Sequence, residues 1–270
     1  MSNKKYELTD EITIICGRTL HRIRALRSFG DVITGVKKGD LGGFVEGEKN
    51  LSHRGTCWVY GEAMVFDKAR VIESAKVIHN ASVYGEAIIS KKAIVENFAQ
   101  VYDRAILSDY AIAANFAKVG GRAIIKDSAV VFEHAMVYGK VFIGGKIWLG
   151  GHSEVFENAE ILIASPILFL RNEARIRGDA RIYSIKDIVT ICPLGSKGGT
   201  LTAYRSKKRG GIELNEDQLG FQGTIDEFTR KVLYENWNNN VYLEQCQATI
   251  SFIKQFFKIN EGGKSWSNIN

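Results

Sequence analysis

Alanine recurs at every sixth position through the centre of the chain, without a break from Ala63 to Ala135. A second apolar residue, usually Val or Ile, follows each alanine two positions later, and the same phase continues to Ile161. An α-helix cannot produce this pattern, because six residues turn it by about 600° and each repeat would drift by roughly 120° around the axis. The small–x–aliphatic unit instead predicts a short strand with two inward side chains, followed by a corner.

Three such units predict a triangular coil of eighteen residues, which stacks on the next coil through parallel strands about 4.8 Å apart. Each corner should lie two positions after the aliphatic residue, where a positive φ favours Gly, Asn and Asp. Sorted by eighteen, the three corners carry the following residues: Asp67, Gly85, Asp103, Gly121, Gly139 and Glu157; His79, Asn97, Asn115, Glu133 and Gly151; and Glu73, Lys91, Asp109, Asp127, Gly145 and Ile163.

The two ends of the chain depart from the repeat. The phase slips by three residues between Ile161 and Ala174, where Pro166 predicts a bulge because proline cannot donate to a strand ladder. The pattern resumes through Ile188 and stops near Pro193. We therefore expect an N-terminal cap (1–44), a β-helix (45–195) and a small α+β domain (196–270). In the last domain we expect strands at 201–206 and 211–215 and helices at 224–237 and 242–257, with Thr224 and Glu227 at capping-box spacing.

The repeat resembles the hexapeptide repeat of left-handed parallel β-helices over roughly residues 45–190. The flanking segments LHRIRALRSFGDV and LTAYRSKKRGGIELNEDQLGFQGTIDEF are similar to those of uncharacterised YdcK-like β-helix proteins of phages and prophages. The resemblance implies a mainly β fold, a left-handed parallel β-helix with three six-residue units per coil, and a small C-terminal α+β domain. Trimers are common in this class, and the phage resemblance brings no established activity with it.

Composition narrows the setting. The four cysteines lie far apart with no CxxC pair, which argues against a disulfide framework or a zinc knuckle and favours a reducing, cytoplasmic location. We expect no signal peptide, and no stretch approaches the ~20 apolar residues of a membrane span. The net charge of +6 favours an acidic partner. One basic cluster predicts contacts to the phosphates of a nucleotide or nucleic acid, or else a solvated turn: Arg205, Lys207, Lys208 and Arg209.

The outward positions differ between the three faces of the coil. One face carries a polar mixture, whereas the other two are apolar in the central coils, and surfaces of that size are rarely left in water. We expect them to form a homotrimer interface, with a cover of C-terminal helices as the alternative. The predicted interface residues are Ile88, Ile106, Ile124 and Phe142 on one face and Ile94, Ile112, Val130 and Trp148 on the other.

Two series of rings follow the eighteen-residue spacing. Tyr84, Tyr102 and Tyr138 predict either a stabilising aromatic ladder or a strip that binds a flat ligand or partner. His134 and His152 share one corner position and should stack on successive coils. Because Phe98 and Phe116 precede them in the same column, a ring ladder is the simpler interpretation, and a metal or acid–base role is the alternative.

Catalytic motifs are missing from the sequence. It contains no GxxxxGK[ST], GxGxxG, HExxH or GxSxG motif. The acyltransferases of the hexapeptide class use a histidine base and a long corner loop, but the only insertion here is three residues long. We therefore predict a non-enzymatic, rigid binding or scaffold protein with no cofactor or metal, acting on a host factor or sequestering a nucleotide signal between subunits. The alternative is an acyltransferase that uses acyl-CoA, with His134 or His152 as its base.

Overall fold

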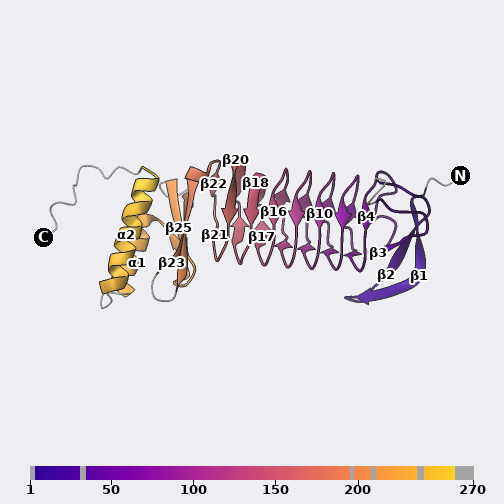
Figure 1. Ribbon diagram of the computed structural model, residues 1–270. Helices are drawn as coiled ribbons and strands as arrows, with labels where there is room; N and C mark the ends of the chain where they lie inside the picture. Colours follow the sequence, from indigo (N-terminus) through magenta and orange to yellow (C-terminus); the bar gives the residue numbers. More distant parts are fainter. Residues whose placement is uncertain (1–3, 31–34, 195–197, 208–210, 236–239, 259–270) are drawn as a thin grey trace.

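The structure is a computed structural model that describes residues 4–30, 35–194, 198–207, 211–235 and 240–258. Its centre is an elongated parallel β-solenoid, with antiparallel strands at the N-terminal end and an antiparallel sheet with two helices at the other end (Figure 1). Ladder partners in the central coils lie eighteen residues apart, as Ile94 and Ile112 do. The predicted parallel β-helix with eighteen-residue coils and a small α+β end is confirmed, and its left-handed winding stays a prediction.

The coils contribute short strands to three faces, which we name A, B and C. Face A contains β3 (Leu41–Val45), β5 (Met64–Val65), β8 (Ser82–Val83), β11 (Gln100–Val101), β14 (Lys118–Val119), β17 (Met136–Gly139), β19 (Glu154–Glu157) and β21 (Arg175–Ile176). Face B contains β6 (Arg70–Val71), β9 (Ile88–Ile89), β12 (Ile106–Leu107), β15 (Ile124–Ile125) and β22 (Arg181–Ile182). Face C contains β4 (Trp58–Val59), β7 (Lys76–Val77), β10 (Ile94–Val95), β13 (Ile112–Ala113) and β16 (Val130–Val131). Two longer strands run from face B into face C: β18 (Phe142–Leu149) and β20 (Glu160–Leu170).

The repeated alanines and aliphatic residues fill the interior of the coils. Every repeat alanine from Ala63 to Ala135 has 0% of its surface exposed, and each aliphatic partner from Val65 to Val137 has at most 1%. In each unit the alanine directly precedes a short strand and the aliphatic residue is the second residue of that strand. The two residues are therefore two positions apart in extended backbone, and both side chains point to the same side. The predicted inward orientation is therefore correct.

The corners adopt the left-handed backbone that the spacing predicted. At every predicted corner position from Asp67 to Glu157, φ lies between 56° and 106°. Lys91 and Glu73 adopt it although their side chains disfavour it. Corner carboxylates also accept hydrogen bonds from backbone N–H groups one coil further on, for example from Gly121 to Asp103 at 3.0 Å and from Lys91 to Glu73 at 2.7 Å. These bonds satisfy donors that the turns would otherwise leave unpaired.

The phase slip produces an insertion in β20. Gly145 pairs with Ile163, and Ile147 pairs with Leu168, so five residue steps oppose two. The bulge expected around Pro166 is confirmed. Ile163, which was predicted at a corner, does not adopt a positive φ but pairs within β20, because the insertion moves the turn beyond it.

The N-terminal end is closed by a hairpin. Strands β1 (Tyr6–Ile15) and β2 (Arg18–Ala25) pair antiparallel, and β2 pairs with β3 at the edge of face A. The residues that follow β2 cross the first coil of face C, where Phe29 forms a bridge to Val36 and its ring lies 5.3 Å from that of Trp58. An open edge of the first coil is thereby covered.

The C-terminal end is a four-stranded antiparallel sheet covered by helices. The sheet contains β23 (Ile188–Leu194), β24 (Gly199–Arg205), β25 (Ile212–Glu216) and β26 (Phe221–Gly223), preceded by a short 3₁₀ helix (Ile185–Asp187). The prediction that Ile188 continues the coils is wrong, since it begins β23 and pairs with Tyr204. The helices α1 (Ile225–Glu235) and α2 (Asn240–Phe256) pack on this sheet through residues such as Phe228 and Ile253.

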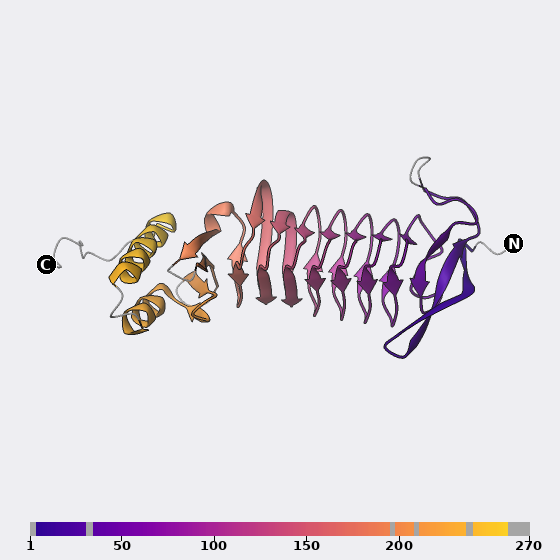
Figure 2. The same ribbon diagram turned by 60° about the horizontal axis from the view of Figure 1, so that its bottom comes forward.

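The predicted capping box at the start of α1 is present. The backbone N–H of Thr224 donates to the Glu227 carboxylate at 2.7 Å, and the N–H of Glu227 donates to the Thr224 hydroxyl at 3.2 Å. Both helices lie beyond the end of the solenoid in two views (Figures 1 and 2). The alternative in which these helices cover faces B and C is therefore wrong for the described residues.

Candidate functional site

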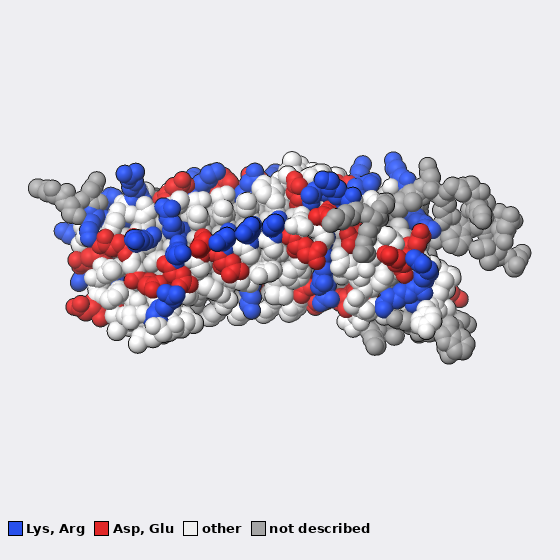
Figure 3. All heavy atoms as spheres, turned by 180° about the vertical axis from the view of Figure 1, so that it is seen from behind, with Lys and Arg blue, Asp and Glu red and all other residues white. Residues whose placement is uncertain are grey.

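Faces B and C carry the predicted apolar residues as continuous ladders. Ile88, Ile106, Ile124 and Phe142 align on face B, and Ile94, Ile112, Val130 and Trp148 align on face C. All are partly exposed, and Trp148 is 41% exposed. In the view from behind, Lys and Arg of the central coils form a narrow row beside surface with few charged residues (Figure 3). Phe169 extends the face C ladder, with its ring 5.4 Å from that of Trp148. The six-residue spacing did not predict this position, because the insertion in β20 shifts the repeat.

The tyrosines form a ladder that is interrupted. The rings of Phe66 and Tyr84 stack at 5.1 Å, and those of Tyr84 and Tyr102 at 5.4 Å. The Tyr102 ring then covers Gly120, where a Cβ atom would lie 2.4 Å from the ring. Burial is the main cause that raises the pKa of Tyr84 and of Tyr102. Tyr138 lies beyond the interruption and is exposed, so the three tyrosines do not form one continuous strip.

His134 and His152 stack as predicted. Their ring centroids lie 4.9 Å apart, and the column continues from His134 to Phe116 at 5.0 Å and on to Phe98 at 5.3 Å. Both histidines are exposed, and neither imidazole has a carboxylate partner among the described residues. Across the described part of the chain, no group of three or more His, Cys, Asp or Glu side chains is placed to hold a metal ion. The column has the geometry of a ring ladder, without the orienting group that a general base needs.

The predicted basic cluster is only partly placed. Arg205 pairs with Asp187 at 2.9 Å, and its guanidinium lies 5.6 Å from the centre of the Phe257 ring. Lys207 is exposed, and Lys208 and Arg209 lie outside the described residues. The contacts of Arg205 hold β24 against the 3₁₀ helix and the end of α2.

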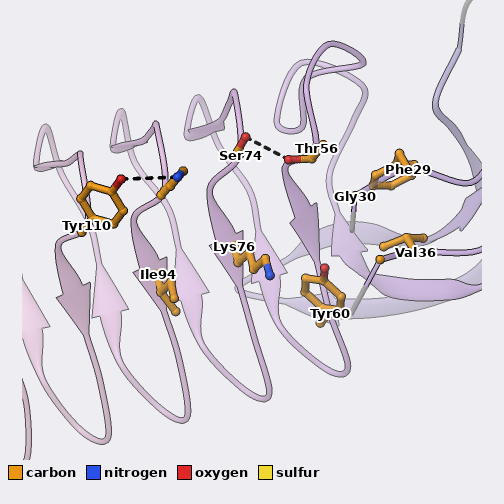
Figure 4. Close-up of a pocket in the computed structure, with 11 residues that line it drawn as sticks. Phe29, Gly30, Val36, Thr56, Tyr60, Ser74, Lys76, Ile94 and Tyr110 are labelled. Carbon is orange, nitrogen blue, oxygen red and sulfur yellow. Dashed lines mark hydrogen bonds between the residues drawn. The ribbon is translucent and has the colours of Figure 1, made fainter. Parts of the chain in front are cut away.

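A groove crosses face C beside the N-terminal cap, and the sequence analysis did not predict it. Its volume is about 480 Å³. Four described residues that follow β2 form one wall, namely Phe29, Gly30, Gly35 and Val36, and the outward residues of the first coils form the floor (Figure 4). The lining residues are Phe29, Gly30, Gly35, Val36, Thr56, Tyr60, Ser74, Lys76, Lys92, Ile94 and Tyr110.

The wall of the groove is held in place by two contacts of Phe29. Its ring contacts Trp58 on the first coil, and the Nζ of the fully buried Lys5 lies 5.2 Å from the ring centre. Lys5 in turn donates hydrogen bonds to the carbonyl oxygen of Cys57 at 2.7 Å and to its Sγ at 3.2 Å. Burial lowers the pKa of Lys5 and raises the pKa of Cys57. These contacts give the groove a preformed wall.

The floor and rim of the groove combine cations with hydroxyl groups. Neither Lys76 nor Lys92 has a carboxylate within ion-pair distance among the described side chains. Lys92 lies 3.4 Å from the Tyr110 hydroxyl and 5.1 Å from the centre of that ring. Thr56 and Ser74 share one hydrogen bond between their hydroxyls at 2.9 Å, which leaves one hydroxyl proton free to donate (Figure 4).

Comparison with known proteins adds no relative: no model of a protein family matches this chain, and no curated protein matches it significantly. Within the described residues, neither α1 nor α2 has the length and apolar character of a membrane-crossing helix.

Proposed function

We propose that this chain is a non-enzymatic binding scaffold that assembles into a homotrimer through faces B and C. The observation that carries the proposal is the pair of apolar ladders, which the chain's own helices leave uncovered. Burying such surface is favourable by about 25 cal/mol per Å². A contact in which face B of one copy meets face C of the next is heterologous, and a rotation of about 120° between neighbouring copies closes it into a ring of three.

The resemblance noted from the sequence supports the rest of the proposal. We assign the solenoid to the left-handed hexapeptide class, in which trimers are common, and relate it to YdcK-like proteins of phages and prophages. On this assignment, the rigid solenoid binds a host factor or a small-molecule signal in the cytoplasm. An acyltransferase has less support, since His134 and His152 have no orienting carboxylate among the described residues and the insertion in β20 is short.

Sedimentation velocity at micromolar concentration tests the assembly. We expect a trimer for the wild type and a monomer for Ile124→Glu, because a carboxylate on face B would lose its water in the interface. Met136→Glu is the matched control, since Met136 occupies the same outward strand position on the polar face A. A monomeric wild type, another stoichiometry, or an Ile124→Glu protein that remains trimeric would overturn the proposal.

Thermal shift with acyl-CoA tests the alternative, an acyltransferase that binds this ligand. A ligand that binds the native state raises the Tm. We expect no shift with acyl-CoA that depends on the histidine column. A clear shift that is lost in His134→Ala or His152→Ala would support the acyltransferase instead.

A further inference from the structure

We infer that the groove on face C binds a free nucleotide, with its phosphates at Lys76 and Lys92 and its base against the apolar wall. This inference names a ligand for the scaffold proposed above. It rests on the chain being a binding protein, and it places the ligand at the cap end of face C, where the floor residue Ile94 also belongs to the proposed trimer interface. The inference combines three properties of the groove, which are its charge, its apolar surface and its size.

The charge favours an anion. Two ammonium groups line one concave surface without a carboxylate partner among the described side chains, although an ion pair between Lys91 and Asp109 lies at the adjoining corner. A concave surface with one sign of charge concentrates the local potential and attracts ions of the opposite sign. The remaining hydroxyl proton of the Thr56–Ser74 pair adds a neutral donor, which is typical of phosphate recognition.

The apolar part of the groove favours a flat ring attached to that anion. Phe29 and Val36 lie on the wall, Ile94 lies on the floor, and Tyr60 and Tyr110 stand at opposite sides (Figure 4). Inorganic phosphate would leave these surfaces hydrated, and an uncharged nucleoside would leave both ammonium groups without a counterion. A nucleotide satisfies both parts at once, since aromatic side chains stack on bases and lysines pair with phosphates.

The size of the groove agrees with this ligand. Its volume of about 480 Å³ lies within the roughly 300–1,000 Å³ usual for small-molecule sites. The contacts of Phe29 with Trp58 and Lys5 fix the wall before any ligand arrives. A preformed wall reduces the entropy lost on binding.

Isothermal titration of the full chain with ATP, AMP, adenosine and inorganic phosphate tests the inference. We expect ATP and AMP to bind at least about tenfold more tightly than adenosine or phosphate. Binding should weaken as salt is raised, because the phosphates and the ammonium groups are partly exposed. No binding of either nucleotide up to millimolar concentration, or equal binding of adenosine, would overturn the inference.

Matched lysine variants locate the site. We expect Lys76→Gln and Lys92→Gln each to weaken nucleotide binding about tenfold. Lys118→Gln is the control for the first, because Lys118 occupies the same outward strand position on face A. Lys140→Gln is the control for the second, because Lys140 also follows a corner residue directly. Equal losses in the control variants would place the nucleotide elsewhere and refute the assignment.

Two further measurements separate this inference from the proposed function. Nucleotide affinity that is unchanged in Ile124→Glu shows that the groove acts in a single copy, and loss of binding in that variant overturns the assignment to one chain. Chromatography of the bound nucleotide after incubation should recover it unchanged. Its conversion to a product would overturn the non-enzymatic proposal and leave the binding site in place.

Discussion

Replacing Leu107 by Ala tests whether the interior of the coil is closely packed. Leu107 points inward from β12 and has 0% of its surface exposed. Its ladder neighbours on the two adjacent coils are Ile89 and Ile125. The substitution removes three carbon atoms, and their transfer to water accounts for about 2.4 kcal/mol at ~0.8 kcal/mol per carbon.

The remaining cavity adds to this loss. Backbone hydrogen bonds of 3.0 Å join Ser90 to Leu107 and Ser108 to Ile125, so the spacing between coils is fixed by the ladder. The coils therefore cannot move together to fill the space, and the loss should fall in the upper part of the ~2–5 kcal/mol range for Leu→Ala. We expect the free energy of unfolding to fall by about 3–5 kcal/mol.

Urea unfolding followed by circular dichroism measures this change at a fixed protein concentration. Gln100→Ala is the control, because Gln100 points outward on face A in the preceding strand and should change stability by less than about 0.5 kcal/mol. If Leu107→Ala costs less than about 1 kcal/mol, or no more than Gln100→Ala, the interior assignment of the repeat is wrong.

Two other predictions concern buried residues outside the ladder of Ile89, Leu107 and Ile125. Burial raises the pKa of Glu216, so the folded state holds this proton more tightly than the unfolded chain, and stability should fall as the pH rises from the ordinary value of 4.5 through the raised one. The Tm of Glu216→Gln, measured relative to that of the wild type, should therefore rise with pH across that window. A difference between the two Tm values that does not change with pH would contradict the pKa shift. Gly120→Ala should destabilise by about 1–3 kcal/mol, because the new methyl group meets the Tyr102 ring. In a Tyr102→Ala background the same change should be nearly neutral, and equal losses of stability in both backgrounds on urea unfolding would refute this contact.

The repeat predicts the solenoid well because each part of a coil is specified locally. The alanine and its aliphatic partner set the inward side of one strand, and the corner follows within two residues. At the corner that contains Glu73 and Lys91, the backbone preference of the individual residues does not explain the conformation. Glu73 and Lys91 are poor residues for a positive φ, yet both adopt it because the ladders on either side fix the path of the backbone.

The end of the repeat could not be located from spacing alone. Ile188 continues the six-residue spacing. However, inward and outward side chains alternate in the same way in a coil strand and in an antiparallel strand, so a few residues do not distinguish the two. Its actual partner is Tyr204 in the next strand, β24. The six-residue spacing therefore does not predict the antiparallel pairing of β23 with β24.

The groove could not be predicted from the repeat, because its residues are of the same types as those at equivalent positions of other coils. Lys76 occupies an outward strand position just as Lys118 does, and only the crossing of the loop after β2 distinguishes their surroundings. Contacts between Val36 on that loop and the coils have no period. The repeat therefore predicts the floor of the groove but not its wall.

One signal could have located the groove, and it also bears on assembly. Trp58 and Trp148 occupy the same outward position of face C, five ladder steps apart. Trp58 is 1% exposed and its ring packs against those of Phe29 and Tyr6, whereas Trp148 is 41% exposed. A large aromatic side chain at an outward position indicates that another segment packs over it, since burying such a side chain contributes more free energy than burying most others. The chain supplies that cover itself at the first coil, and a second copy supplies it at Trp148 if faces B and C meet as proposed.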